Sequence, residues 1–335
     1  MHKTIVSLAI VFVFLFTLIS LVFHSGTASG NQLAQGTIYK PEKGLSVNDI
    51  FSKEEIERTS KKIYNFPKSA FLDFQKTKPQ KKNDAEFCNL PLGLKIAALD
   101  LKSGEIIYGK NRKEKTSIAS ITKLATALVF LDHNPGWDDY YQIKNSDIVG
   151  GAKMHVYLGE QVKIRDLFFL ALIASDNTSA KALANSTGIE NFPEAMNKKM
   201  TELGLLNTSF VDPVGIGMEN ISTAEEVVKL LKAALEQKEI KTAISKKDYQ
   251  FKVLSGREVF VYSTDWLFKN NNEKFTHLGG KTGYTNSAGY CFTGVFEDED
   301  ENEIITAVLN GPTINSRFKY SRDLATWIFN SFVWS

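Results

Sequence analysis

The sequence predicts an α+β (mixed α/β) fold, in which one sheet takes strands from both ends of the folded region and a helical lobe lies between them. Three observations predict it: strand-like patterns at 94–108, helical spacing of apolar residues from 120 to about 237, and a strand-rich block at 277–311. A cleft is expected where the lobe meets the sheet. The chain has 335 residues, 43% of them hydrophobic, and a formal net charge of +2, which gives no reason to expect a nucleic-acid partner.

The first 24 residues predict a transmembrane anchor or a signal segment. Thr4–Phe23 is a run of twenty residues without a charge. A spanning helix needs about 20 apolar residues, whereas the apolar part of a cleaved signal has about 7–15. An anchor is therefore the preferred interpretation. A cleaved signal segment is the alternative, because the small residues Thr27–Gly30 are typical of a cleavage site. Lys3 places the N-terminus on the cytoplasmic side of the membrane, so the chain after the apolar run is expected outside the cytoplasm.

Residues 25–87 have the composition of a basic linker. The stretch from Lys40 to Lys82 holds eleven Lys or Arg residues against six Asp or Glu, and Ser52 with Glu55 forms a capping box that predicts one helix. A solvated spacer is the preferred interpretation, and contact with an anionic membrane or wall polymer is the alternative. The folded domain is expected to span residues 88–335.

Local patterns predict the elements of that domain in order. Apolar runs at 94–101 and 105–108 predict a hairpin. Helical spacing of apolar residues predicts a helix from Ser120 to about His133. Four more helices are predicted, at 165–174, from the polar break after residue 174 to residue 184, at 192–204, and at 222–237 with Ser222 or Thr223 as the cap. Three strands are predicted at 277–283, 288–296 and 303–311, and a closing helix at 320–332.

Ser120 and Lys123 are the first candidate pair for chemistry. Residues three apart on a helix share a face, so the two side chains can touch. A serine hydroxyl becomes a nucleophile when a base takes its proton, and a lysine serves as that base once burial lowers its pKa. The apolar run after Lys123 supplies the burial. The spacing alone is weak, because Ser316 and Lys319 repeat it.

Two further motifs strengthen the signal. Ser175-Asp176-Asn177 lies in a polar break between two apolar helices, and Lys281-Thr282-Gly283 lies on a predicted strand after paired glycines. Each motif alone is more simply a helix cap or an ordinary edge strand. Ser-x-x-Lys, Ser-Asp-Asn and Lys-Thr-Gly in that order are the signature set of penicillin-recognising serine enzymes.

From about Cys88 to Ser335 the chain resembles the D-alanyl-D-alanine carboxypeptidase family, the low-molecular-weight penicillin-binding proteins. The resemblance extends beyond the three motifs to the closing segment SRFKYSRDLATWIF. It implies a β-lactamase/transpeptidase-like fold with a five-stranded antiparallel sheet flanked by helices. Two departures concern substrate preference: Asp176 stands where many carboxypeptidases of the family have glycine, and residues 213–217 lack the usual Gly-Leu pair.

The resemblance also implies catalytic roles. Ser120 would attack the carbonyl between two D-alanines and form an acyl-enzyme, with Lys123 as general base. Ser175 would relay protons to the leaving amine. Asn177 would bind the amide side of the substrate and support Lys123.

The substrate-binding roles follow in the same way. Lys281 would add positive potential, and Thr282, beside Gly283, would bind the terminal carboxylate together with Arg317. The backbone N–H groups of Ser120 and Tyr284 would form the oxyanion hole. The implied partners are a peptidoglycan stem peptide that ends in D-Ala-D-Ala and, as covalent inhibitors, β-lactam antibiotics.

Three other functions stay open beside the carboxypeptidase. A D-alanyl-D-alanine endopeptidase, which cleaves peptidoglycan cross-links, fits the Ser-Asp-Asn variant. A class A β-lactamase ranks lower, because its Glu-x-x-x-Asn pattern is absent where Glu219 and Asn220 stand next to each other. A wall-binding module that lost activity is disfavoured by the intact motifs.

No metal or organic cofactor is expected. None of the five histidines has a metal-ligand spacing to another histidine or to a cysteine. Cys88 and Cys291 are too few for a disulfide scaffold or a zinc site, and two free, buried thiols are preferred over one long-range disulfide.

Overall fold

The computed structural model of the chain describes residues 79–82, 85–269 and 274–334. The chain divides into two units, 1–66 and 67–335, and all described residues belong to the second. The predicted anchor at 1–24 and the predicted helix at Ser52 lie outside the described residues. No helix within the described part is both long and apolar enough to cross a bilayer.

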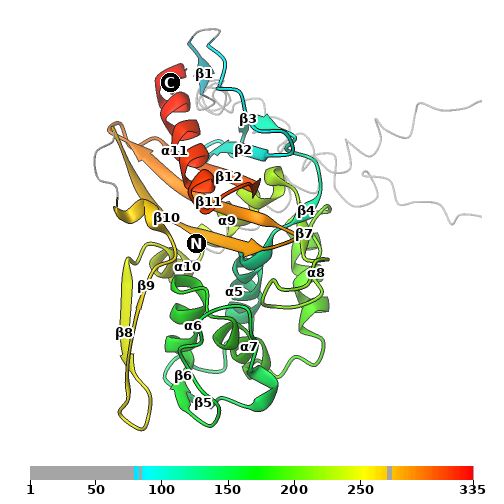
Figure 1. Cartoon of the computed structure of the whole chain (residues 1–335), viewed down its shortest axis with the longest axis vertical. Coiled ribbons are helices and arrows are strands. Elements are labelled where there is room, and N and C mark those ends of the chain that lie inside the picture. The colour runs from blue at the N-terminus through cyan, green and yellow to red at the C-terminus, as the bar shows by residue number, and fades with distance from the viewer. Residues whose placement is uncertain (1–78, 83–84, 270–273, 335) are drawn as a thin grey trace, which may run out of the picture. The chain divides into compact units, whose positions relative to one another are not determined.

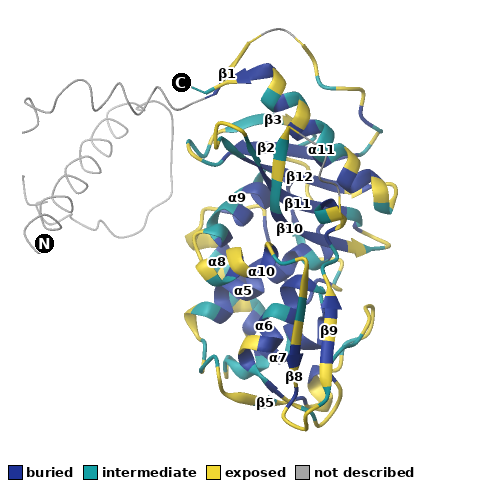
Figure 2. Cartoon of the chain, turned by 90° about the vertical axis from the view of Figure 1, so that its left-hand side faces the viewer, coloured by how far each residue is buried: buried dark blue, intermediate teal, exposed yellow. Residues whose placement is uncertain are grey.

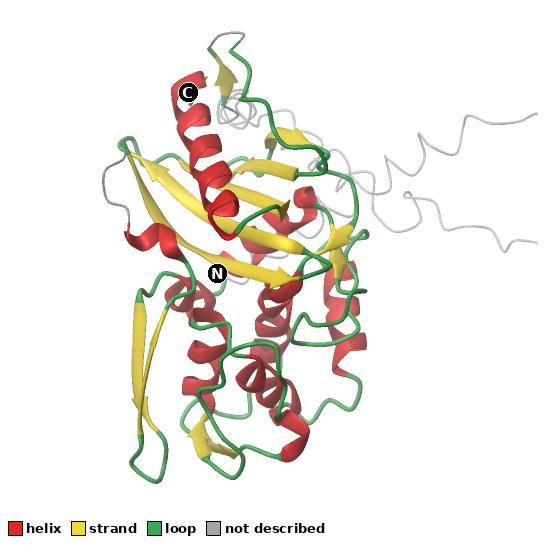
Figure 3. Ribbon diagram, in the orientation of Figure 1, coloured by secondary structure: helices red, strands yellow, loops and turns green. Residues whose placement is uncertain are grey.

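A five-stranded antiparallel sheet confirms the predicted fold class (Figures 1 and 3). Its strand order is β10-β11-β12-β2-β3, so strands from the start of the domain sit beside strands from its end. The predicted hairpin and the three late strands all belong to it. Their bounds are β2 Lys95–Asp100, β3 Ile106–Lys110, β10 Phe275–Thr285, β11 Gly289–Asp298 and β12 Glu303–Gly311.

Both faces of the sheet are covered, because alternate residues of its central strands are apolar on each side. In β2, Ala97 and Leu99 belong to the core that faces the helical lobe, whereas Ile96 and Ala98 belong to a second core on the opposite face. Helix α9, Ala224–Leu235, packs on the first face, and helix α11, Ile314–Ser331, packs on the second. Figure 2 shows the buried strands between these layers.

The helical lobe is built around α5, Thr122–Asp132, and α6, Ile164–Ile173. Their side chains are buried almost all round, which explains the continuous apolar runs of the sequence. The helices around them are α7 Asn177–Ser186, α8 Phe192–Glu202 and α10 Lys238–Ile244. Short strands tie the connecting loops: β4 Thr116–Ser117 with β7 Ile221–Ser222, β5 Tyr140–Gln142 with β6 Gln161–Lys163, and β8 Asp248–Lys252 with β9 Glu258–Tyr262.

The closing helix begins earlier than predicted. It starts at Ile314 instead of Tyr320, because Thr313 caps it and exchanges hydrogen bonds with Ser316. Arg317 therefore lies in the first turn of the helix, not in the segment before it. The hairpin β8–β9 and helix α10 were not predicted.

The N-terminal edge of the described region is tied to the C-terminus. Strand β1, Gln80–Lys81, pairs with β13, Phe332–Val333. The domain boundary at residue 88 stays a prediction. Both cysteines are free, but only Cys291 is buried. The prediction of a buried Cys88 was wrong, because this residue lies in an irregular segment ahead of the sheet.

Candidate active site

Ser120 lies on a short turn that leads into the most buried helix. The 3₁₀ turn η1, Ala119–Ile121, precedes α5, so Ser120 lies two residues before the first residue of the α-helix, Thr122, and not within its first turn as predicted. Ala119 adopts φ +49°, a left-handed conformation that costs a non-glycine residue on the order of 1 kcal/mol or more. Such a value at the residue before Ser120 marks a backbone that the surrounding packing holds in place.

Lys123 is fully enclosed and has three oxygen partners. Its Nζ lies 2.8 Å from Ser120 Oγ, 2.9 Å from Asn177 Oδ1 and 2.8 Å from the carbonyl oxygen of Val214. Only 1% of its surface is exposed. Burial lowers the pKa of Lys123 to about 7, while the carboxylates of Asp176 and Asp212 act in the opposite direction. Near neutral pH a large fraction of this amine is therefore uncharged and able to accept a proton.

A second lysine and a second serine form a matching pair. Lys281, on β10, donates from Nζ to Ser175 Oγ at 2.8 Å and to the carbonyl of Thr282 at 3.1 Å. Burial, then the positive charges of Lys123 and Arg317, hold the pKa of Lys281 well below its ordinary value. Ser175 has φ +59° in the break between α6 and α7. The four residues of the two Ser–Lys pairs come from three segments that are distant in the chain, and the fold brings them to one place.

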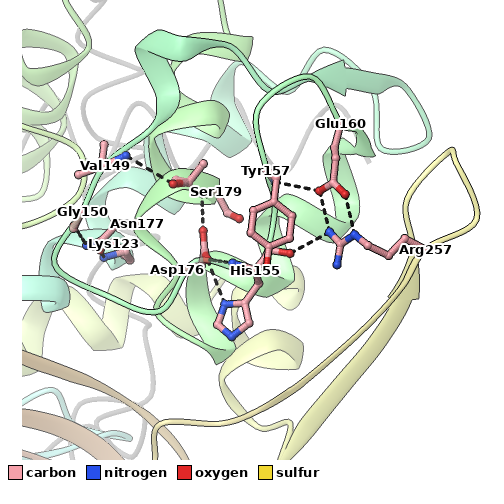
Figure 4. A network of polar contacts seen from close by, with 11 residues as sticks. Lys123, Val149, Gly150, His155, Tyr157, Glu160, Asp176, Asn177, Ser179 and Arg257 are labelled. Carbon is pink, nitrogen blue, oxygen red and sulfur yellow. Dashed lines mark hydrogen bonds and ion pairs between the residues drawn. The ribbon is translucent and has the colours of Figure 1, made fainter.

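Asp176 and Asn177 connect the site to a neighbouring loop, as Figure 4 shows. Asp176 caps α7 by accepting from Ser179 N at 2.7 Å, and it also accepts from the backbone N of His155 at 3.1 Å. The His155 ring lies 3.0 Å from the same carboxylate. Asn177 donates to the carbonyl of Gly150 at 2.7 Å. These contacts fix the loop that forms one rim of the cleft.

The far side of this loop is held by the tip of the β8–β9 hairpin. Arg257 donates to both carboxylate oxygens of Glu160 at 2.6 Å and to the carbonyl of His155 at 3.0 Å. Its guanidinium also lies 4.9 Å from the ring centre of Tyr157. A bidentate pair of this kind fixes geometry as well as charge. The rim loop is thus clamped between α7 and the hairpin (Figure 4).

Thr282 and Arg317 stand at the other end of the cleft. The hydroxyls of Thr282 and Thr264 are 2.6 Å apart. Arg317 donates to the carbonyl of Gly283 at 3.0 Å, and its buried Nε finds no partner among the described residues. Burial lowers the pKa of Arg317 to about 10, so it stays charged at neutral pH. Arg317 lines the cleft, so its charge favours an anionic ligand at this position.

Two glycines allow strand β10 and a nearby loop to approach Ser120 closely. A Cβ on Gly283 would lie 2.7 Å from the carbonyl oxygen of Ile118 and 3.2 Å from the backbone N of Ser120. Gly215, at φ +94°, lies against Ala119, and a Cβ there would collide with its carbonyl oxygen. The positions of these glycines therefore set how near the edge strand comes to the Ser120 N–H.

The two serines of these pairs line one open cleft of about 490 Å³. Seven of the predicted residues line it, while Lys123 and Lys281 are buried beneath its surface. The predicted lining residues are Ser120, Ser175, Asn177, Thr282, Gly283, Tyr284 and Arg317. None of the described lining residues is acidic, and Lys153 and Arg317 are basic, so the lining side chains favour a negatively charged ligand. An anionic ligand with a reactive carbonyl near Ser120 suits this arrangement.

Several residues of the site were missed from the sequence. Val214 acts through its backbone carbonyl, and Asp212 holds that loop by accepting from four backbone N–H groups, those of Val214, Gly215, Ile216 and Gly217. Thr264 joins the site through Thr282. The only available signal was the Asp-Pro pair before two glycines, which predicts a turn but no role. Glu219 is exposed and does not line the cleft.

Comparison with known proteins gives one consistent family. The family model described as D-alanyl-D-alanine carboxypeptidase matches residues 95–313. A D-alanyl-D-alanine endopeptidase of Pseudomonas aeruginosa is 35% identical over 60% of this chain and 68% of the relative, and one of Escherichia coli is 31% identical over 69% and 75%. The solved structure of a D-alanyl-D-alanine carboxypeptidase from Mycobacterium tuberculosis superposes with a TM-score of 0.67 at 25% identity, over 76% of this chain and 99% of that chain.

Proposed function

The chain belongs to the D-alanyl-D-alanine carboxypeptidase family, and on that premise we propose that Ser120 is the nucleophile that cleaves the bond between two D-alanines of a peptidoglycan stem peptide. The single observation that carries the proposal is the hydrogen bond of 2.8 Å between Ser120 and the buried Lys123. A hydroxyl beside a base of lowered pKa is the arrangement that nucleophilic catalysis requires.

The partners of Lys123 support its role as general base. A neutral amine has two N–H groups and one lone pair. Two carbonyl oxygens, those of Asn177 and Val214, take the two N–H groups. The lone pair is left to face Ser120 Oγ, from which it accepts the proton as the oxygen attacks the substrate carbonyl. The ammonium that forms then keeps all three oxygen partners.

The tetrahedral intermediate would be held by the backbone N–H groups of Ser120 and Tyr284. One such donor contributes roughly 3–4 kcal/mol in other enzymes. The terminal carboxylate of the substrate would bind Thr282 and the guanidinium of Arg317. When the C–N bond breaks, the proton taken up by Lys123 would pass through Ser175, next to Lys281, to the leaving amine of D-alanine.

Water would then attack the acyl-enzyme carbonyl and release the shortened peptide. The described cleft residues include no carboxylate that could activate this water, so Lys123, neutral again, is the base within reach. The same lack of a carboxylate favours long-lived acyl-enzymes with β-lactams, because class A β-lactamases use a glutamate for deacylation. We therefore propose β-lactams as covalent inhibitors, not as substrates that are rapidly turned over.

A second candidate is endopeptidase activity on D-alanyl cross-links. The observation that favours it is that the relatives at 35% and 31% identity are both named endopeptidases. The acylation chemistry is the same, and only the leaving amine differs: free D-alanine in one case, a second stem peptide in the other.

Peptidoglycan lies outside the cytoplasmic membrane, so the proposed substrate places the action there. We propose that residues 1–24 anchor the protein in that membrane, because their twenty uncharged residues have the length of a span. Cell fractionation tests this point: the mature protein should stay with the membrane until detergent is added. Recovery of a soluble form that begins near residue 30 would contradict it.

Labelling with a fluorescent penicillin tests the serine mechanism. We expect a covalent adduct with the wild type and none with Ser120→Ala, with both proteins folded by circular dichroism. Defined stem peptides then separate the two activities, since release of free D-alanine indicates the carboxypeptidase and splitting of cross-linked dimers the endopeptidase. A folded wild type that neither binds penicillin nor cleaves any of these peptides would refute the proposal.

A further inference from the structure

A second cleft, of about 440 Å³, lies between the 3₁₀ turn η3, Trp266–Lys269, and the first half of α11. Trp266 is 41% exposed, and one face of its ring stacks on the buried Phe318 at 6.0 Å. Lys269 lies 5.9 Å from the same ring, and Lys319 and Arg322 line the helix side. None of the described residues that line this cleft is acidic. The proposed reaction uses none of them.

The second cleft adjoins the carboxylate end of the first. Arg317 lies with its guanidinium 4.7 Å from the ring centre of Phe318, and that ring stacks on Trp266. On the other wall, Thr264 contacts Thr282 and is separated from Trp266 by one residue. A continuous wall therefore runs from the candidate carboxylate site to the exposed indole.

The proposed roles fix which part of a substrate would reach this wall. The attacked carbonyl lies at Ser120 and Tyr284, and the carboxylate that follows it lies at Thr282, which is earlier on β10. The substrate must then run antiparallel to β10, which is an edge strand of the sheet. Any part of the leaving group that extends beyond this carboxylate therefore points past Thr282 and Arg317, toward Trp266.

A free D-alanine leaving group ends at the carboxylate site and makes no contact with the wall beyond it. A cross-linked substrate continues, because its leaving amine belongs to a second stem peptide with carboxylates and a glycan. An exposed indole offers a flat apolar platform for a sugar ring or peptide, and the cations around it suit carboxylates. Lys319 is paired with Asp323, whereas Lys269 lies beside the exposed indole, and we take Lys269 as the carboxylate contact.

We propose that this cleft is the subsite for the leaving half of a cross-linked peptidoglycan dimer, with Trp266 as its stacking platform and Lys269 as a carboxylate contact. The proposal rests on the proposed function and names its substrate class. It makes the protein an endopeptidase in addition to a carboxypeptidase.

The test compares two soluble substrates on the full chain: a disaccharide pentapeptide monomer and a cross-linked disaccharide tetrapeptide dimer. The variants are Trp266→Ala and Lys269→Glu. The matched controls are Tyr262→Ala and Lys198→Glu, an exposed aromatic residue and an exposed lysine that line neither cleft. We expect each test variant to lose at least about tenfold in kcat/KM on the dimer, the effect of one good contact, and to release D-alanine from the monomer within about twofold of wild type.

Binding gives a second readout. In the Ser120→Ala background, the dimer should bind more tightly than the monomer, and Trp266→Ala should abolish that difference. Unchanged dimer cleavage in both test variants, an equal loss on both substrates, or a wild type that cleaves only the monomer would each overturn this inference and leave the proposed function standing. A wild type that cleaves neither substrate and takes no penicillin label would instead overturn the proposed function. Lys269 is exposed, so its variant remains informative if Trp266→Ala does not fold.

Discussion

Lys123 and Asn177 are 54 residues apart in the chain, and their side chains meet at 2.9 Å in the buried floor of the cleft. The amide oxygen of Asn177 takes one N–H of the lysine while its amide nitrogen holds the rim loop through Gly150. One side chain thus orients the base and shapes the cleft. The first prediction concerns the base itself.

The rate of acylation by penicillin should rise with pH and level off above about 7, the pKa that burial gives Lys123. The reactive form is the neutral amine, so below the pKa each pH unit should lower the rate about tenfold. Second-order labelling rates between pH 5 and 9 measure this profile, with Ser120→Ala as the blank. A rate that stays constant across the range would exclude Lys123 as the base.

Asn177→Asp should move this profile to higher pH. The new carboxylate would lie beside Lys123 and favour its ammonium form, which raises the pKa. At neutral pH we expect acylation to fall by about tenfold or more, since one pKa unit changes the neutral fraction about tenfold. Asn177→Ala is the matched control, because it removes the contact without adding charge. It should slow acylation without the upward shift, and equal midpoints in the two variants would contradict the electrostatic explanation.

The motif residues could be predicted because their signal is local. Ser120 and Lys123 share one turn, and Ser175 and Lys281 carry side chains that the family signature names. The partner of Lys123 at Val214 could not be predicted, because a backbone carbonyl leaves no mark in the sequence. The distances between the segments that carry the three motifs could not be predicted either. They are set by the packing of α5 against α7 and of β10 against η1.

The sheet was predicted well for a similar reason. In β2 and β12 buried apolar residues alternate between two cores, and such runs indicate strands without knowledge of their partners. The β8–β9 hairpin was missed because the exposed positions of β9 are not polar: exposed Phe260 and Tyr262 alternate with the buried Val259 and Val261. The early start of α11 was missed because Thr313 and Ser316 form a capping box without the usual Glu or Gln.

Gly283→Ala should abolish most of the acylation without unfolding the protein. The added Cβ would lie 2.7 Å from the Ile118 carbonyl, so β10 must move away from η1 and from the Ser120 N–H. Loss of one oxyanion donor costs about 10²–10³ in rate in other enzymes. Penicillin labelling rates and a melting curve measure the two effects separately. A variant that keeps its melting temperature and also acylates at the wild-type rate would show that the close approach is not required.

Asp176→Gly would install the residue that many carboxypeptidases of the family have at this position. We expect a loss of stability, because the buried carboxylate caps α7 at Ser179 and also holds His155. Loss of a cap costs about 0.5–2 kcal/mol, and in a domain of this size each kcal/mol lowers Tm by about 2–4 °C. Differential scanning calorimetry measures the shift.

Asp176→Ser separates the two contacts of this carboxylate. A serine is a good cap for α7, but its shorter side chain does not reach His155. We therefore expect a smaller fall in Tm than for glycine. In both variants we expect faster amide hydrogen exchange along residues 150–155, since this rim loop loses its contacts at His155 and keeps only the Asn177 contact at Gly150 on the α7 side. Wild-type exchange rates in this loop for both variants would mean that the Arg257 clamp at the hairpin suffices, and that Asp176 serves the helix alone.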